Sequence, residues 1–273
     1  MIFVPRQNRN MAQAALSQLM LVYHQTVFNL RRSHRNAVVG LAMTVMQSLM
    51  MIAAFMVLYM FMGLRSSPVR GDFLVFMMSG IFLYMTHIQT ISAVGMSGKQ
   101  AKTMSLHEPM TSAVAITAGA LAVLYRQTLA CMVIMAAYYV YQPFTLEYPL
   151  GFIKMFLLAW GAGAAIGLVV LALRPWAPEI VSMAMLVFQR ANMVFSGKMF
   201  LANLMPSFML PMFSWNPLFH IIDQSRGYAF VNYTPMRTSL TYPFYAMIVI
   251  AMLGLILEFV TRKHESLSWS AGH

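Results

Sequence analysis

Residues 38–63 read VVGLAMTVMQSLMMIAAFMVLYMFMG, a run without one charged side chain. An α-helix needs about 20 apolar residues to cross the hydrocarbon core of a bilayer, so this stretch is long enough to span a membrane. The whole chain agrees with it, because 60% of its 273 residues are hydrophobic and 9% are charged. A soluble domain carries about 25% charged residues. The composition therefore predicts an all-α integral membrane protein.

Further apolar segments follow along the chain, and turns with proline or charged residues separate them. They are residues 73–94, 112–141, 150–173, 180–204 and 242–260. The segment 112–141 is longer than an upright crossing needs, so it either tilts or begins outside the hydrocarbon core. Together with residues 38–63, these segments predict about six transmembrane helices.

Two other segments have a mixed character. Residues 11–30 alternate apolar and polar positions, which favours a helix lying in the membrane interface. Residues 205–241 contain four prolines and apolar patches, which favours two short half-helices that re-enter the membrane from the outer face before the last span. An ordinary outer loop is the alternative. The expected domain thus has an interfacial amino terminus (1–37), a membrane part (38–260) and a polar tail (261–273).

Lysine and arginine residues near the predicted spans are distributed unequally between the two sides. One side has Arg6, Arg9, Arg31, Arg32, Arg35, Lys99, Lys102, Arg174, Arg262 and Lys263, and the other has Arg65, Arg70, Arg226 and Arg237. Cytoplasmic connections carry the excess of positive charge, so we expect both termini in the cytoplasm.

No catalytic or metal-binding motif appears in the sequence. The seven histidines are scattered, the one cysteine excludes a cysteine cluster, and no HExxH or GxSxG motif occurs. The pairs Gly98-Lys99 and Gly197-Lys198 lack the frame of a phosphate-binding loop. We therefore expect a chain that is no enzyme and binds no metal or cofactor, with any ATP chemistry on a partner.

Three basic residues stand inside apolar segments, namely Arg126, Arg190 and Lys198. An ionised side chain in a membrane span costs several kcal/mol unless it faces protein or water, so such residues are candidates for function. Arg126 and Lys198 have an alternative interpretation, in which their long side chains reach the interface. Lys198 follows Arg190 by eight residues, roughly 80° around a helix, so we expect both to face one positively charged cavity.

The order of elements and one local series together resemble a known family. The series is Phe195-Ser196-Gly197, then Trp215-Asn216-Pro217-Leu218-Phe219-His220-Ile221-Ile222-Asp223, with Arg226 and Tyr233 after it. It resembles type-2 ABC exporter permeases, and most of all the branch that exports capsular polysaccharide and O-antigen. The basic motif Leu30-Arg31-Arg32-Ser33-His34-Arg35 departs from the family pattern, which leaves the exported polymer open.

The resemblance implies a homodimer in the inner membrane of a bacterium, joined to two cytoplasmic ABC ATPase subunits that bind ATP and Mg²⁺. Such a pump moves a lipid-linked, here capsular, polysaccharide outward through a channel between the two copies. Further partners would lie in the periplasm and outer membrane, and no nucleic acid is involved. The alternatives are export of O-antigen, teichoic acid or a small molecule, or a membrane enzyme that modifies glycans.

Residue roles follow from the resemblance together with the positions of charge. The substrate channel is expected to include Arg126, Arg190, Lys198, Trp215, Asn216, His220, Asp223 and Arg226. Trp215 also fits an aromatic belt at the bilayer surface. The polar connection 95–109 is expected to contact the ATPase through Lys99, Lys102, His107 and Glu108. An interfacial basic motif comprises Arg31, Arg32 and Arg35.

Overall fold

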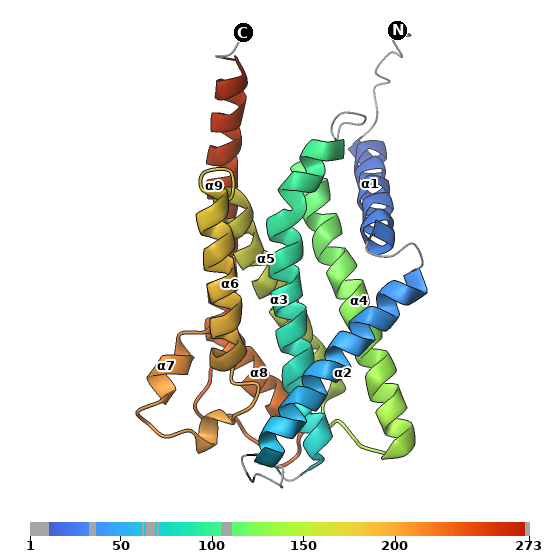
Figure 1. Ribbon diagram of the computed structural model, residues 1–273, viewed down its shortest axis with the longest axis vertical. Helices are drawn as coiled ribbons and strands as arrows, with labels where there is room; N and C mark the ends of the chain where they lie inside the picture. The colour runs from blue at the N-terminus through green and yellow to red at the C-terminus, as the bar shows by residue number, and fades with distance from the viewer. Residues whose placement is uncertain are drawn as a thin grey trace.

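The described part of the protein is a bundle of α-helices. The computed structural model describes residues 11–32, 37–61, 63, 69, 71–104 and 111–270, which contain no β-strand. The helices are α1 (Met11–Arg32), α2 (Ala37–Phe61), α3 (Phe73–Met104), α4 (Ser112–Tyr141), α5 (Pro149–Leu173), α6 (Pro178–Phe195), the short 3-10 helix η1 (Ala202–Leu204), α7 (Leu210–Ser214), α8 (Pro217–Ala229) and α9 (Thr241–Ser270) (Figure 1).

Five helices of the described residues are long and apolar enough to cross a membrane. The candidate spans are Val38–Phe61, Phe73–Gly98, Ser112–Tyr141, Pro149–Leu173 and Thr241–Lys263. The sequence predicted each of them to within a few residues. The expected sixth span is different, because α6 has only 18 residues and its carboxy-terminal half contains Gln189, Arg190 and Asn192.

The expected span over residues 180–204 ends early, which corrects the sequence-based boundary. The helix stops at Phe195, and Gly197 then adopts a φ of 66°. This left-handed conformation is one that glycine adopts without steric cost and that ends helices. The residues after Gly197 therefore leave the helix axis and enter a folded connection to α7 and α8.

The chain passes up and down the bundle in sequence order. In Figure 1, α3 and α5 run toward the end at which α1 lies, and α6 carries the chain back to the opposite end, where α7 and α8 lie. The last helix, α9, returns to the α1 end. The first and last described helices therefore meet the same end of the bundle, as an even number of passes requires.

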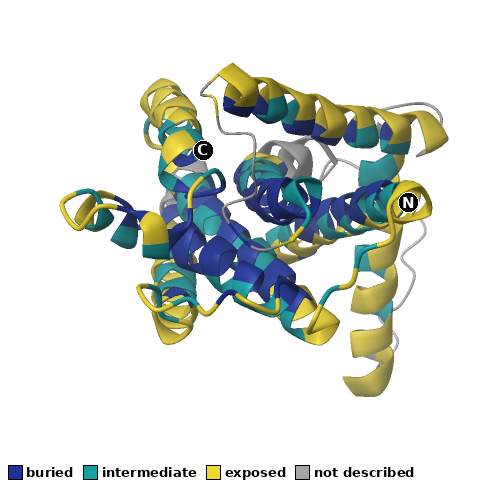
Figure 2. Ribbon diagram, turned by 90° about the horizontal axis from the view of Figure 1, so that it is seen from below, coloured by how far each residue is buried: buried dark blue, intermediate teal, exposed yellow. Residues whose placement is uncertain are grey.

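The first two helices differ in direction from the rest. Figures 1 and 2 show α1 lying largely across the long helices and α2 crossing them obliquely. The helix expected over residues 11–30 is therefore present, and its crosswise direction is the one that an interfacial helix takes. The polar stretch expected to begin at residue 95 continues α3 as far as Met104, while residues 105–110 lie outside the described part.

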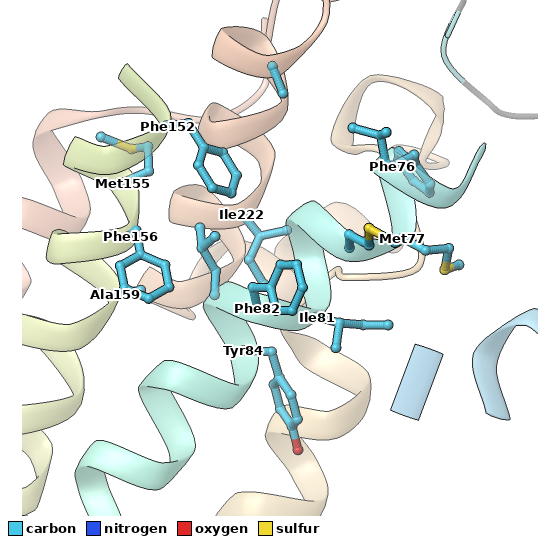
Figure 3. Close-up of a cluster of buried hydrophobic side chains, with 14 of the residues drawn as sticks. Phe76, Met77, Ile81, Phe82, Tyr84, Phe152, Met155, Phe156, Ala159 and Ile222 are labelled. Carbon is cyan, nitrogen blue, oxygen red and sulfur yellow. The ribbon is translucent and has the colours of Figure 1, made fainter. Parts of the chain in front are cut away.

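The core centres on α3, which contacts α4, α5 and α8. Figure 2 shows buried residues at the centre of the bundle and exposed residues on its outer helices. Phe82 of α3 lies next to Ile222 of α8, and Phe76 of α3 and Phe156 of α5 belong to the same buried cluster (Figure 3). These contacts join the re-entrant candidate α8 to the membrane helices.

Small residues bring α5 close to α3. A side chain on Gly163 would meet the carbonyl oxygen of His87 at 2.6 Å, and one on Gly167 would meet Cβ of Val94 at 2.7 Å. Glycine at these two positions lets the helix backbones approach directly, which is how helices associate tightly in membranes.

Candidate functional site

A polar groove lies among α2, α3, α4 and α6, with the end of α1 beside it. Its volume is about 610 Å³. The polar side chains that line it, and that define the name polar groove below, are Asn29, Thr44, Gln47, Gln89, Ser92, Arg126 and Gln189. Five helices supply these side chains. Three of them, α2, α3 and α4, contain candidate membrane spans, and α6 is close to the length of a span. The groove therefore gathers hydrogen-bonding groups between apolar helices.

Side-chain hydrogen bonds hold the walls of the polar groove together. The amide of Gln189 on α6 donates to the hydroxyl of Ser92 on α3 at 2.9 Å. The amide of Gln89 on α3 faces the carbonyl oxygen of Gln47 on α2 at 3.5 Å. Each side chain still has donors or acceptors to spare, so the groove can accept further hydrogen bonds from a polar ligand.

Asn29 adds a donor at the α1 edge of the polar groove. Its side-chain oxygen accepts a hydrogen bond from Gln25 at 3.4 Å, while its buried Nδ2 has no hydrogen-bond partner. A buried amide without a partner costs on the order of 1–3 kcal/mol. A ligand that accepts this hydrogen bond would remove the cost.

Of the residues expected to line a substrate channel, Arg126 is the one that lines the polar groove. It is half-buried on α4. Arg190 lies next to the groove residue Gln189 in sequence but is exposed on the outside of α6. The apolar residues Met183, Val187 and Val194 are exposed on the same helix. The fold thus separates the two arginines, one inside a groove and one on an outward helix face.

Lys198 has a different position from the one predicted. Because α6 ends at Phe195, Lys198 shares no helical face with Arg190, and the expectation of one cavity from helical spacing is wrong. Its ammonium lies 3.4 Å from the ring centroid of Tyr84 and 4.7 Å from that of Phe55. The side chain is 1% exposed, and Nζ has no hydrogen-bond partner. Lys198 therefore does not reach the surface.

Arg226 binds the connection that follows α6. Its guanidinium donates to the carbonyl oxygens of Gly197 at 3.1 Å, of Phe200 at 2.6 Å and of Lys198. It also lies over the ring of Phe76, 4.1 Å from the centroid. The side chain is fully buried. Its fork of donors thus holds three backbone carbonyls of the connection that follows α6.

Asp223 joins the segments on either side of α8. Its carboxylate accepts hydrogen bonds from the backbone of Ala202 at 3.2 Å, the hydroxyl of Tyr233 at 2.5 Å and the hydroxyl of Thr238 at 2.8 Å. Asp223 is 1% exposed. A carboxylate that accepts three hydrogen bonds from the chain is held in place, and it positions the loops before and after α8.

Asn216 and His220 have similar structural partners. The side chain of Asn216 caps α8 by accepting from Leu218 at 3.0 Å and donates to Asn192 at 2.7 Å. In His220, Nδ1 accepts from the backbone of Ser239 at 3.0 Å, so Nε2 carries the proton and donates to the carbonyl of Ser214 at 2.8 Å. These two residues therefore hold α8 against its neighbours.

Trp215 is the exposed member of this series. It is 53% exposed, and its indole donates to the carbonyl of Met212 at 2.6 Å. An exposed tryptophan at the end of a bundle fits an aromatic belt as well as a sugar contact. Residues 215–226 form a structural unit in which Trp215 offers the most surface to a ligand.

The ATPase-contact residues lie largely outside what the structure describes. His107 and Glu108 fall among residues 105–110, and the side chains of Lys99 and Lys102 are likewise outside the described part. In the basic motif, Arg31 is exposed at the end of α1, Arg32 ends that helix, and Arg35 is not among the described residues. These assignments stay predictions.

Sequence reasoning missed most of the polar groove because it searched for charges. Thr44 and Gln47 on α2, like Gln89 and Ser92 on α3, are three residues apart, which places each pair on one helix face. That spacing is the feature of the sequence from which part of the polar groove could have been predicted. Their convergence with Gln189 depends on how the helices pack.

No model of a known protein family matches the chain, and no curated protein does. Within the described residues, no group of three His, Cys, Asp or Glu side chains is placed to hold a metal ion.

Proposed function

We propose that the chain is the permease subunit of an ATP-driven ABC exporter that moves a lipid-linked, capsular polysaccharide across a bacterial inner membrane. The observation that carries this proposal is the polar groove inside a bundle of apolar helices. Polar groups at membrane depth are costly, and their usual use is to form the path of a polar substrate. The resemblance of residues 195–233 to exporter permeases supplies the class of transporter.

The chemistry of the polar groove favours a hydroxylated substrate. Amides and hydroxyls such as Gln47, Gln89 and Ser92 form hydrogen bonds in both directions, as sugar hydroxyl groups require. Arg126 adds one positive charge, which suits an acidic sugar or a lipid-linked phosphate. A glycan-modifying enzyme would need a catalytic group among these residues, and the groove presents amides, hydroxyls and one guanidinium.

The path of the chain supports six crossings with a re-entrant segment before the last. If α6 crosses together with the five candidate spans, the ends of the chain lie on one side, and the excess of basic residues makes that side the cytoplasm. The segment 205–241, including α7 and α8, would then re-enter from the outer face. Of its short helices, α8 packs against α3 and α5, and α7 contacts α8, so protein covers α8 as irregular backbone at membrane depth requires.

Arg190 supports a dimer. In a single copy it lies exposed among Met183, Val187 and Val194 on α6, where contact with lipid would cost several kcal/mol. A second copy facing α6 across a wet channel removes this cost. Two copies would then bind two ATPase subunits near the carboxy-terminal end of α3.

Transport with the partner ATPase in proteoliposomes tests the proposed function. Lipid-linked capsular polysaccharide should stimulate ATP hydrolysis by the complex. The double variant Gln47→Leu, Gln89→Leu should need about tenfold more glycan for half-maximal stimulation, because two hydrogen bonds are lost. Thr117→Val, an exposed change outside the polar groove, is the control.

Two results would reject the proposal. One is a complex that no lipid-linked glycan stimulates, and the other is a double variant with the glycan dependence of the unchanged protein. Stimulation by a small hydrophobic compound alone would instead favour a small-molecule exporter.

A further inference from the structure

A second groove lies between the first halves of α5 and α9 and shares no lining residue with the polar groove. Its volume is about 810 Å³. The lining residues used below, which define the name α5–α9 groove, are Lys154, Leu157 and Leu158 of α5 with Phe244, Tyr245 and Met247 of α9. Both helices contain candidate membrane spans that include these positions. The groove therefore opens toward lipid.

The walls of the α5–α9 groove suit a hydrocarbon chain. Leu157, Phe244 and Tyr245 are 45%, 48% and 65% exposed, so they form an open apolar surface. Gly161 lets α9 come close at the deeper end, because a side chain there would meet the sulfur of Met247 at 2.7 Å. The indole of Trp160 donates to the carbonyl of Ala120 at 2.8 Å. That donor is therefore not available to the groove.

Lys154 is the charged residue in the lining. It is exposed, and it forms no ion pair with any carboxylate of the described residues. It lies five residues after Pro149, where α5 begins, which corresponds to roughly 7.5 Å along the helix. From this depth a lysine extends its ammonium to the bilayer surface while its stem stays along apolar groups.

The position of Lys154 indicates which kind of molecule would bind in the α5–α9 groove. A cation at the edge of an apolar groove needs an anion that brings its own hydrocarbon, and in a membrane that is a lipid phosphate. The start of α5 lies at the α7–α8 end of the bundle (Figure 1). We propose that the α5–α9 groove binds one anionic phospholipid, with its headgroup phosphate at Lys154 and an acyl chain between α5 and α9. The lipid would cover a surface that the protein leaves open and would join α9 to α5.

Native mass spectrometry of the full chain in nanodiscs tests this site, with phosphatidylglycerol compared with phosphatidylcholine. The unchanged protein should retain one phosphatidylglycerol per chain. Lys154→Gln should weaken phosphatidylglycerol binding about fivefold, the factor for one lysine at an anionic membrane surface, and should weaken phosphatidylcholine binding less, because choline offsets the charge of its phosphate. Leu157→Trp should fill the groove and reduce retention of both lipids.

The controls separate a site from general effects. Lys263→Gln removes a lysine at the far end of the α9 span, and Ile153→Trp adds bulk on an exposed α5 position outside the lining; both should bind as the unchanged protein does. Equal retention of the two lipids by the unchanged protein would overturn the proposal. So would unchanged phosphatidylglycerol binding in Lys154→Gln, or protein-to-protein crosslinks through Lys154 with no lipid retained.

Discussion

Arg126, Arg190 and Lys198 carry the same charge, yet the fold gives them three different environments. Arg126 lines the polar groove, Arg190 is exposed on α6, and the Lys198 ammonium lies against the rings of Tyr84 and Phe55. Ring faces stabilise a buried cation that lacks a carboxylate partner. One sequence signal, a basic residue in an apolar segment, therefore corresponds to three roles.

Arg190 has one rival interpretation, a structural ion pair with Glu179 or Glu258. The structure weakens it, because Glu258 accepts from Arg262 at 2.7 Å and from Ser112 at 2.9 Å. Glu179 is exposed in the first turn of α6, eleven residues before Arg190. An arginine without these partners is free to bind an anion in the space between two copies.

At Arg190 we predict that Arg190→Ala lowers export while the protein stays inserted and dimeric. Arg190→Lys should rescue export only partly, because lysine keeps the charge but not the two parallel hydrogen bonds to phosphate. Surface polysaccharide is measured together with the membrane abundance of each variant. Export that falls in step with abundance would mean a structural arginine, and unchanged export would dismiss both roles.

Among the elements, the connection after α6 is the most tightly determined. Gly197 has a φ of 66°, and its carbonyl and those of Lys198 and Phe200 accept from Arg226. The α8 residue Asp223 binds Ala202 and Tyr233 on either side. This unit joins α6 to α8, so movement of one helix must move the other.

At this connection we predict that Gly197→Ala destabilises the protein more than Gly63→Ala. Both glycines have positive φ values, 66° and 72°, so both variants lose about 1 kcal/mol to backbone strain. A side chain at 197 would also meet Phe219 at 2.3 Å, whereas nothing lies within 4 Å at 63. Thermal unfolding can be followed with a thiol-reactive dye, because the chain has one cysteine and Cys131 is buried. Equal losses in the two variants would contradict the prediction.

For the molecule as a whole, the polar groove and the proposed ATPase contact lie on a common framework. α3 supplies Gln89 and Ser92 to the groove and continues to Met104, next to residues 105–110. A push on this end would travel along a rigid helix into the groove. Such a rigid-body shift is an established way to couple two distant sites.

We predict that the purified chain alone does not hydrolyse ATP. We also predict that Glu108→Lys reduces the stimulation of ATP hydrolysis that the chain causes in a partner ATPase. Loss of one charge contact should lower this stimulation about threefold. Glu147→Lys is the matched control, because Glu147 is exposed in the loop before α5, at the opposite end of the bundle. ATP hydrolysis by the isolated chain would refute the need for a partner, and equal stimulation with both variants would refute the contact at Glu108.

The sequence by itself predicted the all-helical class and the five candidate spans. The reason is that the cost of placing polar backbone and charges in lipid acts on each segment separately, so a contiguous apolar run is sufficient to reveal a span.

Tertiary structure alone decided the site. Gln47, Gln89 and Gln189 come from three helices and converge only when α2, α3 and α6 pack. Likewise, the Lys198 ammonium lies against the rings of Phe55 and Tyr84 only because α2 and α3 pack against the connection after α6. Hydrogen bonds and packing between distant residues depend on spatial proximity, and neither composition nor helical periodicity contains that information.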